Sequence, residues 1–90
     1  MGRYLGMAKQ HAESIRDYYY AAGALGYQQA EYHFHQLFSL IGRAHSSKND
    51  KADVPLITEM VKTASPLMDE MKKRQDEWLR NAEDESHQRK

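Results

Sequence analysis

The sequence predicts an all-α fold: an antiparallel helical hairpin or a small bundle of three to four helical segments, completed by oligomerisation. Small or apolar residues recur at alternating steps of three and four in both halves of the chain, the spacing of one helix face. A polar stretch without this periodicity separates the halves. No stretch alternates as a strand does, so residues 1–90 are assigned to a single helical domain.

The first helical region is predicted over residues 3–44. Its inner face contains Leu5, Ala8, Ala12, Ile15, Tyr19, Ala22, Gly26, Ala30, Phe34, Leu37, Ile41 and Ala44. Three successive steps of four, from Ala22 through Gly26 and Ala30 to Phe34, form a stutter in the heptad pattern. Gly23 and Gly26 each cost about 1 kcal/mol inside a helix relative to alanine. The region is therefore either one long helix with close packing at the glycines or two helices joined by a turn near Gly26.

Residues 42–53 are predicted to form a loop, because they are small, polar and aperiodic. Gly42 is a candidate C-cap for the preceding helix. Asp53 has the side chain of a helix N-cap, and Pro55 suits the first turn that follows, where an N–H group has no helical partner. We therefore expect a second helical region to begin at residue 54.

The second helical region is predicted over residues 54–83. The heptad positions on its inner face are Ile57, Val61, Ala64, Met68, Met71, Gln75, Trp78 and Ala82. Pro66 interrupts this pattern, and an interior proline costs about 3 kcal/mol. We expect either a kink at Pro66 or a break that leaves one helix over 54–64 and another over 66–83. Residues 84–90 carry no apolar anchor and are expected to fray.

The two regions are expected to pack through a thin core that self-association completes. A chain of this size buries only roughly 60–65% of its unfolded surface, which leaves a small stability margin. The seam of the second region is assigned to Ile57, Met60, Val61, Ala64, Met68, Met71 and Trp78. The residues assigned to the core or to an oligomer interface are Tyr19, Ala22, Gly26, Phe34, Leu37, Phe38 and Ile41. A homodimer or higher oligomer is predicted, with residues 34–41 as its densest apolar region.

The composition argues against several classes of protein. The chain has no cysteine, which excludes disulfides and thiolate metal sites and fits a cytoplasmic location. No stretch has the pattern of a signal peptide or a membrane span, so no membrane role is expected. The 13 basic residues balance the 13 acidic ones, whereas nucleic-acid-binding proteins usually carry a basic excess on one face.

Tyrosines exceed what one helix face can bury. Tyr18, Tyr19 and Tyr20 are consecutive and spread over about 200° of a helix surface. One neighbouring helix covers roughly a third of the helix circumference, so it cannot cover all three. Either a third segment or a second chain buries the surplus, or the surplus forms a recognition patch, because tyrosine and arginine dominate binding hot spots. The residues assigned to a partner-binding patch are Arg16, Tyr18, Tyr20, Tyr27 and Tyr32.

Metal-binding and catalytic motifs do not occur in the sequence. His33 and His35 are two residues apart, which places their rings about 200° apart on a helix, whereas helical zinc sites use pairs four residues apart. A metal site would need ligands from another helix or chain, so neither a metal nor a cofactor is predicted. No serine has a neighbouring His–acid pattern and no glycine-rich phosphate loop is present, so no enzymatic activity is predicted.

By elimination, the sequence predicts a small non-enzymatic protein that binds another macromolecule, in the first place another protein, as a regulator, adaptor or inhibitor. Small helical chains of this kind are common among phage and bacterial regulators, which is an analogy and not a deduction. Two alternatives stay open. One is a nucleic-acid-binding regulator that uses the basic residues between 72 and 80. The other is an oligomer that sequesters a nucleotide-like ligand by stacking on Tyr20 or Tyr27 beside Arg16.

Overall fold

The protein folds into three long helices in the computed structural model, which describes the backbone of residues 3–88 and the side chains of residues 3–82. Helix α1 spans Arg3–Ala21, α2 spans Tyr27–Ser46 and α3 spans Val54–Gln88. Two short 3-10 segments, η1 (Gly23–Gly26) and η2 (Lys51–Asp53), lie in the connections. Residues 3–88 contain no strand, which confirms the predicted all-α fold.

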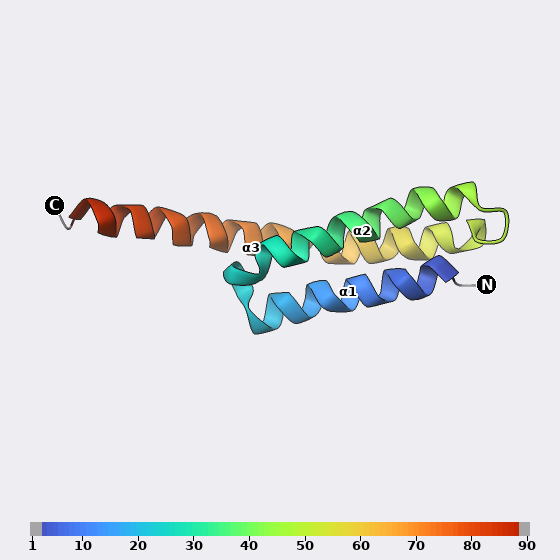
Figure 1. The fold of residues 1–90 in the computed structure, drawn as a ribbon, viewed down its shortest axis with the longest axis horizontal. Coiled ribbons are helices and arrows are strands. Elements are labelled where there is room, and N and C mark those ends of the chain that lie inside the picture. Colours follow the sequence, from blue (N-terminus) through green and yellow to red (C-terminus); the bar gives the residue numbers. More distant parts are fainter. Residues whose placement is uncertain (1–2, 89–90) are drawn as a thin grey trace.

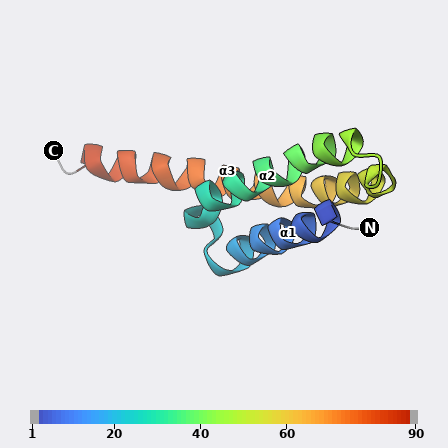
Figure 2. The same ribbon diagram turned by 45° about the vertical axis from the view of Figure 1, so that its right-hand side comes forward.

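The helices pack side by side as an up-down-up bundle (Figure 1). Helices α1 and α3 run in the same direction, α2 runs antiparallel to both, and each helix contacts the other two. In Figure 2, α3 projects from the end of the bundle that carries the turn between α1 and α2. The molecule measures 62 × 21 × 15 Å. It is elongated because α3 has 35 residues, against 19 in α1 and 20 in α2.

The connection between α1 and α2 is a tight turn, so the first helical region consists of two helices. Gly23 has a φ of 55°, in the left-handed region that favours glycine. Gly26 is buried, and a Cβ atom at this position would lie 3.1 Å from Tyr18 Cβ, from the Tyr18 carbonyl oxygen and from Ala22 Cβ. Ala22 itself is exposed in the turn. It therefore lies outside the core of a single chain, and its role in an oligomer stays a prediction.

Alanine at Gly26 is expected to lower the free energy of unfolding by about 1–3 kcal/mol, because the added methyl group crowds the backbone of Tyr18. Gly42 supplies the matched control, since it lies inside α2 with nothing within 4 Å of its Cβ position. Gly42→Ala should raise the free energy of unfolding by about 0.5–1 kcal/mol. Urea denaturation followed by circular dichroism measures both changes, and effects of the same sign would contradict the turn geometry.

Helix α2 continues to Ser46, so the loop predicted over 42–53 begins too early. Gly42 lies inside α2 and is not the C-cap of this helix. The C-cap is Ser47, whose backbone is extended (φ −96°, ψ 127°). In the turn that follows, Ser47 Oγ donates a hydrogen bond to Asp50 Oδ2 at 2.7 Å, and Asp50 is buried. The helix persists beyond Gly42 because Ala44 is fully buried and holds the last turn against the core.

Helix α3 begins where the sequence predicts and ends later. Its first residue, Val54, follows Asp53 directly, and Pro55 lies in the first turn as expected. The helix continues to Gln88, five residues beyond the predicted end at 83. Most of the tail predicted to fray, 84–90, is therefore helical, and residues 89–90 lie outside the described part of the chain.

Pro66 does not interrupt α3, so the predicted break into helices over 54–64 and 66–83 is wrong. Proline lacks the N–H group that would bond to the carbonyl of Lys62. Pro66 is exposed, whereas Ala64 and Met68 on either side of it are buried in the core. The packing of these neighbours holds the helix together across the missing hydrogen bond.

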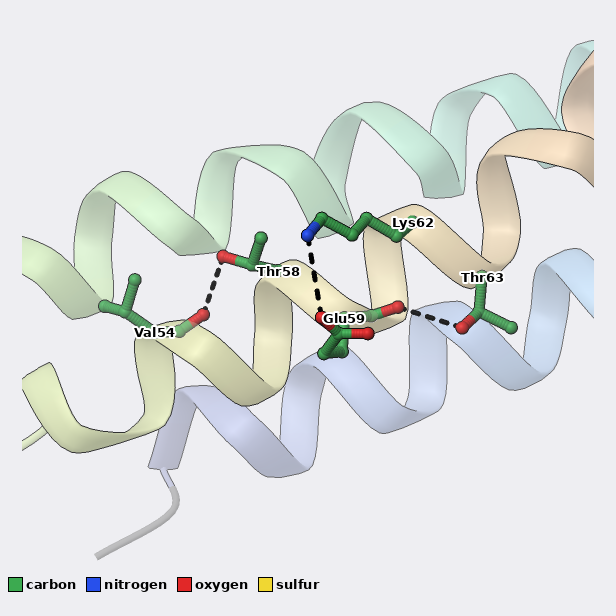
Figure 3. Close-up of polar contacts among 5 residues, drawn as sticks. All are labelled: Val54, Thr58, Glu59, Lys62 and Thr63. Carbon is green, nitrogen blue, oxygen red and sulfur yellow. Dashed lines mark hydrogen bonds and ion pairs between the residues drawn. The ribbon is translucent and has the colours of Figure 1, made fainter.

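Polar side chains in the first half of α3 form contacts within the helix itself (Figure 3). Thr58 Oγ1 donates to the Val54 carbonyl at 2.8 Å, and Thr63 Oγ1 donates to the Glu59 carbonyl at 2.9 Å. Glu59 and Lys62 form an ion pair at 3.6 Å, with side chains that are 70% and 69% exposed. An exposed pair contributes only about 0–1 kcal/mol, so these contacts do not hold the bundle together.

The core of the bundle is apolar and consists of a single cluster. Its buried members are Ala8, Ile15, Ala30, Leu37, Leu40, Ala44, Ile57, Ala64, Met68 and Met71. Tyr19, Phe34 and Ile41 are partly buried against this cluster, which agrees with their predicted core positions. Phe38 is 59% exposed and does not join the core of a single chain. Its predicted position in an oligomer interface stays a prediction.

Candidate partner-binding surface

The C-terminal part of α3 leaves the bundle and runs past the turn between α1 and α2 (Figures 1 and 2). Among the described side chains of α3, which end at residue 82, Met71 is the last buried one, and every side chain from 76 to 82 is exposed. We call residues 76–88 the α3 extension. At 1.5 Å per residue, this extension is about 20 Å long.

Two large apolar side chains on the α3 extension face solvent. Trp78 is 54% exposed and Leu79 is 47% exposed. Trp78 lies one heptad after the fully buried Met71, so the seam that packs α3 onto the bundle continues uncovered along the extension. The prediction that Trp78 packs in this seam is wrong, because α1 and α2 meet at their turn before they reach it.

Arg74 fixes the base of the α3 extension. Its guanidinium carbon lies 5.3 Å from the centroid of the Tyr19 ring of α1, a cation–π contact. Its Nε donates to Glu70 Oε1 at 3.2 Å, and its Nη1 lies 3.8 Å from the Cβ position of Gly23 in the turn. The point at which α3 leaves the bundle is therefore held by α1 and by the turn.

Two tyrosines of the predicted partner-binding patch are partly covered by the chain itself. The ring of Tyr18 stacks on His33 of α2, with ring centroids 6.0 Å apart. The hydroxyl of Tyr27 donates to Glu31 Oε2 at 3.0 Å, in a shallow pocket between α2 and α3. Burial, followed by the hydrogen bond to Glu31, raises the pKa of Tyr27 above its ordinary value. Helix α2 thus covers part of Tyr18, and α3 lies beside Tyr27.

The other three residues of that predicted patch are exposed on different helices. Tyr20 on α1 is 76% exposed, and its ring forms a T-shaped pair with that of Tyr19, with centroids 5.0 Å apart. Tyr32 on α2 is 60% exposed. Arg16 lies at a cleft between α1 and α3. The five predicted residues therefore face several sides of the bundle, and their joint role as one patch stays a prediction.

The cleft between α1 and α3 has a volume of about 230 Å³. Its lining residues are Ala12, Arg16, Glu59, Met60, Thr63, Ala64 and Leu67. Ligand pockets usually enclose roughly 300–1,000 Å³. Neither Tyr20 nor Tyr27 lines this cleft, so the proposed stacking of a nucleotide beside Arg16 gains no support from it.

His11 and His33 meet at the interface of α1 and α2, a pairing that the sequence analysis missed. Their Nδ1 atoms are 3.0 Å apart, and their ring centroids are 5.2 Å apart. Partial burial, followed by the repulsion of a charged His33, lowers the pKa of His11. No local signal marks this pair, because its register across the two helices depends on where the turn falls.

The stability of the bundle is expected to fall as the pH is lowered from 7.5 to 5.5. The folded-state pKa of His11 lies below its ordinary value of 6.5, so the unfolded chain binds more protons below this pH. His33 and Tyr18 face this ring system, and no carboxylate pairs with either histidine among residues 3–82. Urea denaturation with a chelator present measures the loss.

His11→Gln should reduce this pH dependence, because glutamine carries no titrating group. His35→Gln is the matched control, since His35 is exposed on α2 and forms no hydrogen bond among the described residues. If the wild type and His11→Gln lose the same stability on acidification, another group is responsible.

Two further features bear on the classes of site that the chain can form. Among residues 3–88, no helix is long and apolar enough to cross a membrane. Among the side chains of residues 3–82, no three His, Cys, Asp or Glu groups converge on one point. Comparisons of the chain with protein-family models, curated proteins and solved structures find no match.

Proposed function

We propose that this protein acts by binding another protein through the α3 extension, as a regulator, adaptor or inhibitor without enzymatic activity. The observation that carries the proposal is the exposure of Trp78 and Leu79 on a helix that has left its own bundle. A short helix without packing is marginal in water, because most helical stability in proteins comes from an apolar face that packs. A partner that covers the extension supplies this packing.

The side chains of the α3 extension suit a concave apolar partner surface. Trp78 and Leu79 are adjacent, so they form a broad apolar edge spanning about 100° of the helix. Tryptophan is among the residues that contribute most to binding when a pocket encloses it. An amphipathic helix that inserts such residues into a hydrophobic groove is a common mode of protein recognition.

The charges around the extension favour a protein over a nucleic acid as the partner. Short acidic and basic groups follow one another along this part of α3: Asp69 and Glu70, then Lys72, Lys73 and Arg74, then Asp76 and Glu77, then Arg80. Affinity for nucleic acid depends on cations that neutralise phosphates, and nearby carboxylates oppose this. The four acidic side chains therefore weaken the case for the nucleic-acid-binding alternative.

The test compares the proteins captured from source-cell lysate by wild type and by two double variants. Trp78→Ala with Leu79→Ala should abolish capture of the specific partner, because loss of a hot-spot side chain costs about 2 kcal/mol or more of binding free energy. Tyr20→Ala with Tyr32→Ala should retain it, since those residues lie on the bundle. Loss of the partner only in the tyrosine variant would overturn the proposal.

Two measurements on the purified chain separate the other candidate partners. Sedimentation at micromolar concentration tests the predicted homo-oligomer, and self-association that is lost in the Trp78/Leu79 variant would identify a second copy as the partner. Binding to duplex DNA at low salt tests the nucleic-acid alternative. DNA binding at low salt, with an affinity that falls steeply as the salt concentration rises, would favour that alternative over the proposal.

A further inference from the structure

The His11–His33 pair brings two metal-binding groups from different helices to one point. His11 lies in the middle of α1 and His33 in the first half of α2. Both rings are partly exposed, and each presents its Nδ1 atom to the other at 3.0 Å. The pair lies apart from the α3 extension and plays no part in the proposed function.

The spacing of the two nitrogen atoms is close to the spacing that one ion requires. Two Zn–N bonds of about 2.0–2.1 Å at a tetrahedral angle place the nitrogens about 3.3 Å apart. The observed separation is 3.0 Å, a few tenths of an ångström shorter. In the hydrogen-bonded pair the two nitrogens point at each other, so each ring must also turn by about 35° to direct its lone pair at a shared ion. Without an ion, one imidazole donates its N–H to the other, which holds the same two atoms in place.

Aromatic neighbours support His33 in this orientation. Tyr18 stacks on its ring with an interplanar angle of 25°, and Tyr32 contacts it edge-on with centroids 5.4 Å apart. Such packing limits the rotation of the imidazole and lowers the entropy that the ring loses when it binds an ion. The His11 ring comes from α1 and is tilted by 43° from that of His33.

We propose that His11 and His33 form a two-histidine site for Zn²⁺ at the interface of α1 and α2. Imidazole nitrogens prefer Zn²⁺ and transition-metal ions such as Cu²⁺ and Ni²⁺ to Mg²⁺ and Ca²⁺, which prefer oxygen ligands. No third His, Cys, Asp or Glu joins the pair among the described residues, so water completes the coordination. Because the ligands lie on different helices, the ion links α1 to α2 and stabilises the folded bundle.

The test is a titration of the tag-free chain with ZnCl₂ at pH 7.5, followed by calorimetry and thermal unfolding. We expect one Zn²⁺ per chain and a melting temperature that continues to rise with the logarithm of the free Zn²⁺ concentration above the Kd. His11→Gln and His33→Gln should each weaken binding by about tenfold or more. His35→Gln and His45→Gln are matched controls and should bind Zn²⁺ as the wild type does. Cu²⁺ should bind more tightly than Zn²⁺, and Mg²⁺ should not compete.

A second measurement needs no variant and so does not depend on whether a variant folds. In imidazole ¹⁵N spectra of the wild type, Zn²⁺ should shift the Nδ1 resonances of His11 and His33 and leave those of His35 and His45 in place. Shifts confined to His35 or His45 would overturn the site. So would wild-type affinity in both His11→Gln and His33→Gln, or no binding at millimolar Zn²⁺.

Discussion

Replacing Leu37 with alanine is expected to lower the free energy of unfolding by about 3–4 kcal/mol. Leu37 has no exposed surface and lies on the face of α2 that packs into the single core cluster. Removal of a fully buried leucine side chain loses its transfer free energy and leaves a cavity. Since domains of this size have about 5–10 kcal/mol of stability, the variant should be close to unfolding. Urea denaturation followed by circular dichroism measures the change.

The adjacent residue provides the control for this prediction. Phe38 is 59% exposed, so Phe38→Ala should change the free energy of unfolding of a single chain by about 0.5 kcal/mol or less. A cost for Phe38→Ala that grows with protein concentration would show that Phe38 is buried between chains, as the predicted oligomer requires. A cost equal to that of Leu37→Ala at every concentration would contradict the register of α2.

Replacing Pro66 with alanine is expected to raise the free energy of unfolding by about 2 kcal/mol. The substitution restores the hydrogen bond from residue 66 to the Lys62 carbonyl and removes the clash of the proline ring with that carbonyl. An interior proline costs about 3 kcal/mol relative to alanine. Part of this gain is lost in the alanine variant, because its unfolded chain has more conformational entropy than the unfolded chain with proline. Pro66 is exposed, so no core contact is lost.

Pro55→Ala is the matched control for the effect of proline on α3. Pro55 is exposed in the first turn of the helix, where its missing N–H would have no partner. Its replacement should leave stability unchanged or lower it by about 0.5 kcal/mol. If Pro66→Ala also lowers stability, the proline is required for the way in which α3 packs on α1 and α2.

The core could be predicted from the sequence because the heptad pattern is strong. All of the buried apolar residues except Leu40 lie at predicted positions of the inner faces. The start of α3 was also predicted correctly, from two local signals, Asp53 and Pro55, and not from the heptad pattern. The periodicity reflects the spacing of side chains along one helix, so it can be recognised in the sequence without knowing which helices pack against each other.

Features that depend on two helices could not be predicted. The pairing of His11 with His33 requires the register of α1 on α2, which the turn at Gly23 sets. The exposure of Trp78 follows from the difference in length between α3 and its two neighbours. The heptad pattern alone cannot separate a covered position from an uncovered one, since both carry apolar residues.

Local sequence rules were wrong where packing overrides them. Gly42 and Pro66 both disfavour a helix, and α2 and α3 continue through them. In each helix, buried residues follow the unfavourable position: Ala44 in α2, Met68 in α3. The contribution of these residues to the core outweighs a local cost of about 1 kcal/mol for the glycine and about 3 kcal/mol for the proline.

Site-specific photo-cross-linking in the source cells tests the role of the α3 extension most directly. A photoreactive phenylalanine analogue replaces Ala82 in one variant and Tyr20 in the other, two residues that are both exposed. Ala82 lies four residues after Trp78 and three after Leu79, on the same face of α3, so both proposed binding residues are kept. The proposed function predicts a discrete protein adduct from position 82 and none from position 20. An adduct from position 20 alone, or none from position 82 when the purified variant is folded, would contradict it.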